Sequence, residues 1–166
     1  MKIVRFGEHM QETLGLLDDQ NKVRSLKEVF DLSNNESIGD HVIIEKLKNI
    51  DINSLPVVDS DVRLGVPIND VSKLICIGLN YSDHAEEAGM AIPTEPIVFM
   101  KSISALNGPN DNVELPKNSS KSDWEVELAF VIGKKTKNVS EADAMDYVSG
   151  YTICNDVSER AWQLEH

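Results

Sequence analysis

The sequence predicts a mostly β protein of the α+β class, in which short helices connect the strands. Its 166 residues are 41% hydrophobic and 27% charged, the composition of a soluble globular chain. A chain of this length can bury roughly 70% of the surface that it exposes when unfolded, so it needs no disulfide scaffold. Short apolar or alternating runs recur along it, bounded by Gly, Pro, Asn and Asp, and no repeat or low-complexity tract interrupts them. Disordered, collagen-like and coiled-coil structures are therefore excluded.

Residues 1–70 are expected to form a small, strand-rich N-terminal domain with one helix. Strands are predicted at residues 2–6 (KIVRF) and 22–26 (KVRSL), the second of them after the turn signal Asp-Asp-Gln-Asn. The apolar spacing of HVIIEKLKNI, residues 41–50, predicts the helix. Two prolines within residues 53–67 indicate a connector to the rest of the chain.

Residues 71–166 have stronger strand signals and are expected to form a second domain. Its longest predicted strand is WEVELAFVIGK, residues 124–134, whose alternation places Glu125, Glu127 and Ala129 on one face and an apolar row on the other. The other predicted elements of this domain are a strand at 74–79, a short helix at 84–89, a strand at 97–101, a short helix opened by a capping box at 140–143, and a strand at 148–157.

Charge and hydropathy exclude two classes of partner. The chain has 16 Lys and Arg against 28 Asp and Glu, a formal net charge of -12, and such an acidic surface repels phosphate backbones and anionic lipid headgroups. It contains neither a secretory leader nor a run of about 18 apolar residues, so we expect a cytoplasmic protein that binds no nucleic acid and no membrane. In that reducing compartment Cys76 and Cys154 are expected to be buried small side chains rather than a disulfide.

Glu125 and Glu127 are the first candidate site residues. Two carboxylates side by side on a sheet repel each other unless solvent, a basic partner or a cation relieves the repulsion. Asp156 follows the apolar run YTIC and so lies where a strand ends, at the rim of a sheet. Three such oxygen donors suit a hard divalent ion, Mg²⁺ or Mn²⁺, better than zinc. The alternative is that the glutamates form the wet stripe of a half-exposed strand and that Asp156 is a turn residue.

His84 and Glu87 are the second candidate pair, because their spacing puts both on one helical face. A carboxylate beside an imidazole raises its basicity and fixes its orientation, as a general base that takes a proton from water requires. The alternative is a solvated helix on which the pair is incidental. Lys101 and Arg160 are isolated cations near these motifs and are candidate anchors for an anionic substrate, with surface salt bridges as the alternative.

Three strings resemble the fumarylacetoacetate hydrolase family, in order and at the family's spacing: LICIGLNYSDHAEEAG (74–89), EPIVFMKSISALNGPND (95–111) and DWEVELAFVIGKKTKNVSEADAMDYVSGYTICNDVSERAWQLE (123–165). The resemblance runs without a gap from about Leu74 to the last residue, and residues 1–70 resemble the small, more variable N-terminal domain of many bacterial members. It implies a mixed β-sandwich roll with a metal site in its cavity, assembled as a homodimer.

The resemblance also implies a role for each candidate residue. By motif, Glu125, Glu127 and Asp156 match the metal ligands, His84 and Glu87 match the dyad that activates water, and Lys101, Arg160 and Gln163 match residues that line the substrate pocket. The family's catalytic domain continues beyond the point where this sequence stops, with another active-site lysine and the strands that close the sheet. We therefore expect the C-terminal part of the catalytic domain to be missing here.

The function that the resemblance implies is Mg²⁺-dependent hydrolysis of the carbon–carbon bond of acylpyruvates or other 2,4-diketo acids, which are small anionic 2-oxo acids, through an enolate that the metal stabilises. The motif SERAWQLE, residues 158–165, is similar to the corresponding segment of family members that act on 2,4-diketo-3-deoxy sugar acids. Because a scaffold does not determine the reaction, an oxaloacetate-type decarboxylase, an isomerase or hydratase and a non-catalytic relative stay open. A nucleophilic enzyme that uses Cys76 or Cys154 with His84 is a further alternative, which thiol-blocking reagents would test.

Overall fold

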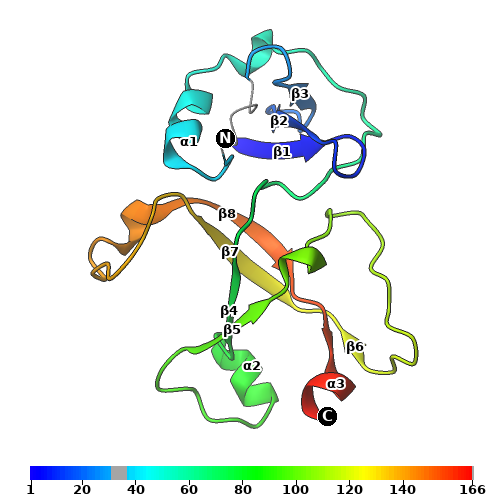
Figure 1. The fold of residues 1–166 in the computed structure, drawn as a ribbon, viewed down its shortest axis with the longest axis vertical. Helices are drawn as coiled ribbons and strands as arrows, with labels where there is room; N and C mark the ends of the chain where they lie inside the picture. Colours follow the sequence, from blue (N-terminus) through cyan, green and yellow to red (C-terminus); the bar gives the residue numbers. More distant parts are fainter. Residues whose placement is uncertain (31–36, 166) are drawn as a thin grey trace. The chain divides into compact units, whose positions relative to one another are not determined.

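The computed structural model describes residues 1–30 and 37–165, in which strands predominate over helices (Figure 1). The predicted mostly β class is confirmed, and every strand pair in the described residues is antiparallel. The chain forms two compact units, of which the first combines Met1–Asn69 with Gly108–His166 and the second is Asp70–Asn107. The predicted division into domains 1–70 and 71–166 stays a prediction. None of the helices in the described ranges is long and apolar enough to cross a membrane.

The N-terminal sheet consists of three antiparallel strands in chain order: β1 (Lys2–Phe6), β2 (Thr13–Leu17) and β3 (Val23–Ser25). The predicted turn between β2 and β3 is confirmed, because Asp18 Oδ1 accepts hydrogen bonds from the backbone N–H groups of Gln20 and Lys22, each at 2.9 Å. β2 is a strand that the sequence did not predict, since its central Gly15 weakens the strand pattern of TLGLL.

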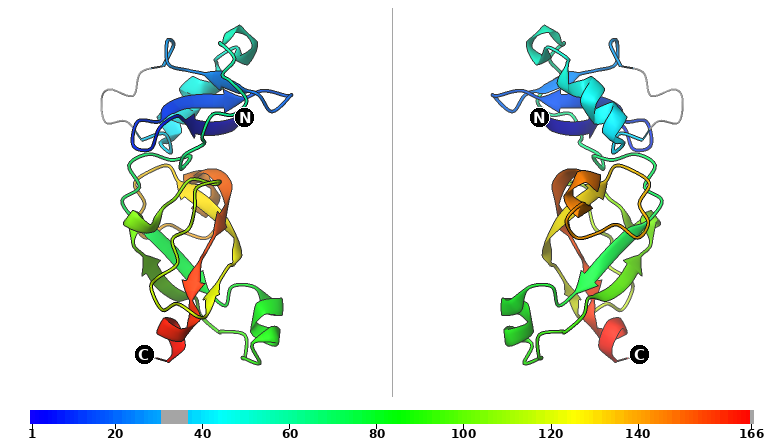
Figure 2. Two further views of the ribbon diagram at one scale, coloured as in Figure 1. Left: turned by 90° about the vertical axis from the view of Figure 1, so that its right-hand side faces the viewer. Right: turned by 90° about the vertical axis from the view of Figure 1, so that its left-hand side faces the viewer.

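Helix α1 (His41–Lys48) covers one face of this sheet, as the right-hand view of Figure 2 shows. Its N-cap is Asp40, whose Oδ1 accepts a hydrogen bond from the backbone N–H of Val42 at 2.7 Å. The short 3₁₀ helix η1 (Ile52–Ser54) follows it. The helix and the sheet enclose a cluster of buried aliphatic side chains: Leu14, Leu16, Leu26, Ile38, Ile43, Leu47 and Leu55.

An ion-pair network ties the edge of this sheet to more distant parts of the first unit. Arg63 donates to both carboxylate oxygens of Asp111, through Nε at 2.8 Å and Nη2 at 2.6 Å, and through Nη1 to Glu12 at 2.9 Å. Arg5 donates to the other oxygen of Glu12 at 3.0 Å. The Glu12 side chain is only 6% exposed, so solvent screens these pairs weakly.

The second unit contains the predicted strand, helix and strand in that order. Strand β4 (Leu74–Gly78) pairs with β5 (Ile97–Lys101) in an antiparallel register that sets Leu74 opposite Lys101. Helix α2 (Ser82–Glu87) follows β4, and the 3₁₀ helix η2 (Ile103–Ala105) follows β5.

The remaining part of the first unit consists of two strand pairs and short helices: β6 (Ser122–Asp123), β7 (Val126–Ile132), η3 (Ala144–Tyr147), β8 (Val148–Asn155), β9 (Ser158–Glu159) and α3 (Arg160–Leu164). β7 pairs with β8, and the short β6 pairs with β9. The Glu159 carboxylate joins the second pair, because it accepts hydrogen bonds from the Ser119 and Ser122 hydroxyls and from the backbone N–H of Lys121. These bonds hold the pKa of Glu159 below its ordinary value.

One predicted detail of this region is wrong. β8, with 8 residues, is longer than β7, with 7, although the sequence predicted β7 as the longest strand. The predicted short helix after the capping box is found as the 3₁₀ helix η3, and the Asp143 backbone N–H donates to Ser140 Oγ at 3.3 Å.

Candidate functional site

The carboxylates that the sequence predicts as metal ligands lie at one end of the β7–β8 pair. Glu125 immediately precedes β7, Glu127 lies in β7 opposite Cys154, and Asp156 immediately follows β8. The backbone N–H of Asp156 donates to the carbonyl of Glu125 at 2.8 Å. The antiparallel register therefore brings the backbones of Glu125 and Asp156, which are far apart in the sequence, next to each other.

Glu125 and Glu127 share one face, as the alternation of the sequence predicts. Both are half-buried, as are Ala129 and Val131 further along the same face. The side chains between them lie on the opposite face and are exposed. The glutamates are therefore less exposed than the apolar row on the opposite face.

Arg160, the first residue of α3, is held by three side chains. Its Nε donates to Asp123 Oδ2 at 3.0 Å, its Nη1 donates to Gln163 Oε1 at 3.0 Å, and its Nη2 forms an ion pair with Glu125 Oε1. Burial by itself lowers the pKa of Arg160, but the hydrogen bonds to Asp123 and Glu125 outweigh it and raise the pKa above its ordinary value. The guanidinium is thus a permanent, oriented positive charge beside one of the predicted metal ligands.

Asp123 is a site residue that the sequence reasoning missed. It lies in β6, two residues before Glu125, and its carboxylate contacts Arg160 at two nitrogens, Nε at 3.0 Å and Nη2 at 2.9 Å. The alternation D-x-E-x-E in the sequence was a signal that could have found it, because the acidic row of Glu125 and Glu127 extends backwards to this position.

The carboxylate set fits a hard divalent ion in its chemistry and its backbone placement. Carboxylate oxygens are the protein ligands that Mg²⁺ and Mn²⁺ take, and Asp156 and Glu125 are joined by a backbone hydrogen bond. The side chains are oriented differently, because Glu125 is turned toward Arg160. Within residues 1–30 and 37–165, no three His, Cys, Asp or Glu side chains come close enough together to hold a metal ion. One carboxylate oxygen of Glu125, Oε1, is therefore already paired with a cation.

The other predicted site residues belong to the second unit. His84 lies in α2 and is half-buried, and Glu87 is the last residue of that helix and is exposed. The backbone N–H of His84 donates to Asp83 Oδ1 at 2.9 Å, and for the described residues the structure records no hydrogen bond between the His84 and Glu87 side chains. Lys101 is the half-buried last residue of β5. The dyad and the lysine anchor stay predictions.

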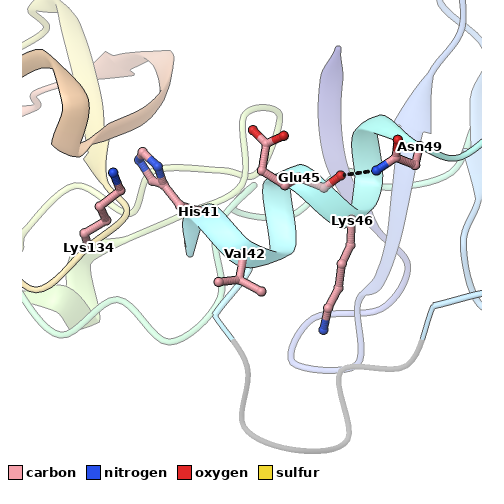
Figure 3. A pocket seen from close by; sticks show the side chains of 6 residues that line it. All are labelled: His41, Val42, Glu45, Lys46, Asn49 and Lys134. Carbon is pink, nitrogen blue, oxygen red and sulfur yellow. Dashed lines mark hydrogen bonds between the residues drawn. The ribbon is translucent and has the colours of Figure 1, made fainter.

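A separate, shallow hollow of about 550 Å³ lies in the first unit, between α1 and Lys134 (Figure 3). None of the predicted site residues lines it. One of its edges is fixed by the Asn49 side-chain amide, which donates to the backbone carbonyl of Glu45 at 2.9 Å. The hollow and the predicted site are thus different places on the unit.

Cys76 and Cys154 are half-buried, and within the described part of the chain neither forms a disulfide. Both are therefore less buried than the sequence predicted, because the strands that carry them, β4 and β8, are partly exposed.

Comparison with known proteins places the chain in a family. The family model described as "Fumarylacetoacetate (FAA) hydrolase C-terminal" matches residues 73–166. A protein of Burkholderia orbicola whose name assigns it provisionally as a hydrolase is 49% identical over 99% of this chain. The chain spans 58% of the length of that relative.

Two solved structures are similar over nearly the whole chain. The fumarylacetoacetate hydrolase of Exiguobacterium antarcticum has a TM-score of 0.79 and 30% identity, and the match covers 100% of this chain and 59% of that one. The 2-hydroxyhepta-2,4-diene-1,7-dioate isomerase of Mycobacterium marinum has a TM-score of 0.67 and 29% identity, and the match covers 99% of this chain and 57% of that one. With the family model and the folds in agreement, the chain belongs to the fumarylacetoacetate hydrolase family.

Proposed function

We propose that the protein is a Mg²⁺-dependent hydrolase that cleaves the carbon–carbon bond of acylpyruvates or other 2,4-diketo acids. The observation that supports this most directly is at the end of one strand pair, where the backbones of Glu125 and Asp156 are hydrogen-bonded and Arg160 pairs with the Glu125 carboxylate. Membership of the family supports the same reaction class. Diketo sugar acids are included in the proposed substrate class.

In this proposal Glu125, Glu127 and Asp156 would hold the ion, and Mg²⁺ would supply positive charge that stabilises negative charge developing on the substrate. His84, which Glu87 orients, takes a proton from a water molecule while the water oxygen attacks the C4 carbonyl carbon. The C3–C4 bond then breaks, its electron pair goes to the pyruvate fragment as an enolate, and protonation at C3 completes the product. Lys101 and Arg160 bind the substrate carboxylate, and Gln163 keeps Arg160 in place. We also propose that the protein is cytoplasmic and forms a homodimer.

A second candidate function is isomerisation of an unsaturated 2-oxo diacid. It is favoured by the structural similarity to a protein named as an isomerase, at a TM-score of 0.67. Isomerisation moves a proton between carbons and needs no attacking water, and one fold supports several reactions. The structure named as a hydrolase has the higher TM-score, 0.79, and we therefore put hydrolysis first.

The test is a set of steady-state assays on the protein as its gene encodes it. Acylpyruvates, diketo sugar acids, oxaloacetate and an unsaturated 2-oxo diacid are assayed with Mg²⁺ and after removal of divalent ions with EDTA. We expect Mg²⁺-dependent release of pyruvate from an acylpyruvate. Isomerisation without hydrolysis would favour the second candidate, and hydrolysis that survives EDTA would overturn the metal dependence.

A further inference from the structure

Glu125 already has a cationic partner. The Arg160–Glu125 ion pair is sheltered, with side chains 23% and 19% exposed, whereas Asp123, the other acid that holds Arg160, is 48% exposed. A charge-assisted hydrogen bond at a sheltered position is stronger than one at an exposed position. The Arg160 guanidinium therefore occupies the Glu125 carboxylate that the proposed function assigns to a divalent cation.

We propose that Arg160 and a divalent cation are alternative partners of Glu125, so that ion binding releases the guanidinium from this carboxylate. The inference rests on the proposed function, because it takes Glu125 as a ligand of the ion. Its physical basis is that a guanidinium neutralises Glu125 and repels a second cation placed next to it. The cation therefore binds most favourably when Arg160 has withdrawn.

Asp123 and Gln163 keep the released guanidinium in the site. Nε and Nη1 of Arg160 donate to these two side chains, each at 3.0 Å, and neither of these bonds involves Glu125. Nη2 faces Glu125 and also lies 2.9 Å from Asp123 Oδ2, so release frees one of its two N–H groups for a new acceptor. Arg160 then becomes available to an anionic ligand when the ion arrives, and Asp123 acts as a positioning residue.

The experiment measures ion affinity rather than activity. Mg²⁺ is titrated by calorimetry and Mn²⁺ by electron paramagnetic resonance, without substrate, into the protein as its gene encodes it. Arg160→Gln removes the competitor. Lys121→Gln is the matched control, because Lys121 lies in the same corner, where its carbonyl accepts the Arg160 backbone N–H at 2.9 Å, but its side chain pairs with Glu165. Each substitution removes one positive charge.

We expect Arg160→Gln to bind both ions on the order of tenfold more tightly than the wild type, and Lys121→Gln to change the affinity by less than about twofold. Arg160→Lys is the second variant, for the case that the glutamine disturbs folding. Arg160→Lys keeps the positive charge but loses the branched guanidinium that contacts Asp123 and Glu125 at the same time. This variant should therefore also bind the ions more tightly than the wild type.

Equal affinities for Arg160→Gln and Lys121→Gln would overturn the inference, since they would mean that Glu125 bridges the ion and the guanidinium at once. Glu125→Gln separates this failure from failure of the proposed function. If Glu125→Gln abolishes ion binding, the proposed metal site is supported independently of the result for Arg160. If it leaves ion binding unchanged, the proposed ligand set is wrong, and the inference is overturned with it.

Discussion

Glu127 and Glu125 have different surroundings although they leave the same strand face two residues apart. Glu125 immediately precedes β7 and pairs with Arg160, whereas Glu127 lies within β7, opposite Cys154. A substitution at Glu125 therefore changes both the proposed ion site and the position of Arg160. A substitution at Glu127 removes one proposed oxygen donor and leaves the Arg160 pair in place.

We predict that Glu127→Gln lowers the affinity for Mg²⁺ by at least about 100-fold, because one anionic ligand of a three-carboxylate site is replaced by a neutral one. Calorimetric titration with Mg²⁺ measures this affinity. Glu114→Gln is the control, since it makes the same charge change in an exposed loop and should retain the wild-type affinity. Wild-type affinity in Glu127→Gln would show that the proposed ligand set is wrong.

We predict that His84→Ala lowers kcat for hydrolysis by about 10²- to 10⁴-fold and leaves Mg²⁺ binding intact, because a general base acts on the chemical step. Steady-state kinetics and the same titration measure the two quantities. A change confined to KM would mean that His84 only binds substrate. Decarboxylation of oxaloacetate needs no attacking water, so equal losses in hydrolysis and decarboxylation would contradict the role of His84 as the base.

At the scale of the elements, α1 shows how the burial of one helix face supports the N-terminal sheet. Leu47 is buried in the core cluster, while Val42, on the same helix, is 63% exposed. We predict that Leu47→Ala destabilises the protein by about 2 to 5 kcal/mol, since truncation leaves a cavity between helix and sheet. Val42→Ala is the control, and chemical denaturation should show little change for it. Similar losses for both variants would contradict the assigned faces.

The network around Arg63 makes stability depend on pH. The hydrogen bonds from Arg63 lower the pKa of Asp111 below its ordinary value. Burial raises the pKa of Glu12, but the hydrogen bond from Arg63 and the charges of Arg5 and Arg63 outweigh it and lower this pKa as well. Both groups therefore bind fewer protons in the folded state than in the unfolded chain, and their stabilisation is lost as the pH falls through their folded pKa values.

We predict that Arg63→Met has a lower Tm than the wild type at pH 7 and that this difference shrinks as the pH falls below the ordinary carboxyl pKa values, about 4. Thermal unfolding at several pH values measures it. Lys48→Met is the control, because it removes a pair with Glu45 in which both side chains are more than half exposed, 56% and 67%. A Tm difference between Arg63→Met and the wild type that stays constant with pH would contradict the linkage.

At the scale of the whole molecule, the 166 residues leave one face of the β7–β8 pair in solvent. Four apolar side chains of β7 on this face are between 49% and 67% exposed: Val126, Leu128, Phe130 and Ile132. On β8, Tyr151 and Ile153 are 58% and 78% exposed, and the register sets them opposite Phe130 and Leu128. A continuous exposed apolar face of this kind is typical of a surface that packs against further protein.

We predict that the 166 residues expressed alone self-associate and lack hydrolase activity even with Mg²⁺ added, because water contacts this face of β7 and β8. Sedimentation velocity should give masses above the 18.5 kDa of one chain. Phe130→Asp should reduce the association, whereas Val42→Asp, which adds the same charge outside this face, should not. A stable monomer that hydrolyses a diketo acid would contradict the prediction.

The strands and helices that the sequence predicted are those whose pattern is local. The runs KIVRF, LICIGL and IVFMK and the helix around HVIIEKLKNI carry their own periodicity, and each is found where it was expected. β2 and the lengths of β7 and β8 were not predicted correctly. The reason is that pairing with a neighbouring strand, which is a long-range contact, decides where a strand begins and ends.

What the sequence by itself determined is the family, the mostly β class and the shared face of Glu125 and Glu127, because motif spacing and alternation are properties of consecutive residues. Only the tertiary structure decided that Arg160 binds Asp123 and Glu125. That contact depends on the pairing of β6 with β9, which brings residues 122–123 against residues 158–159 and so turns the start of α3 toward Glu125. Side-chain partners across such a pairing follow from strand register, and no local pattern encodes the register of so short a pair.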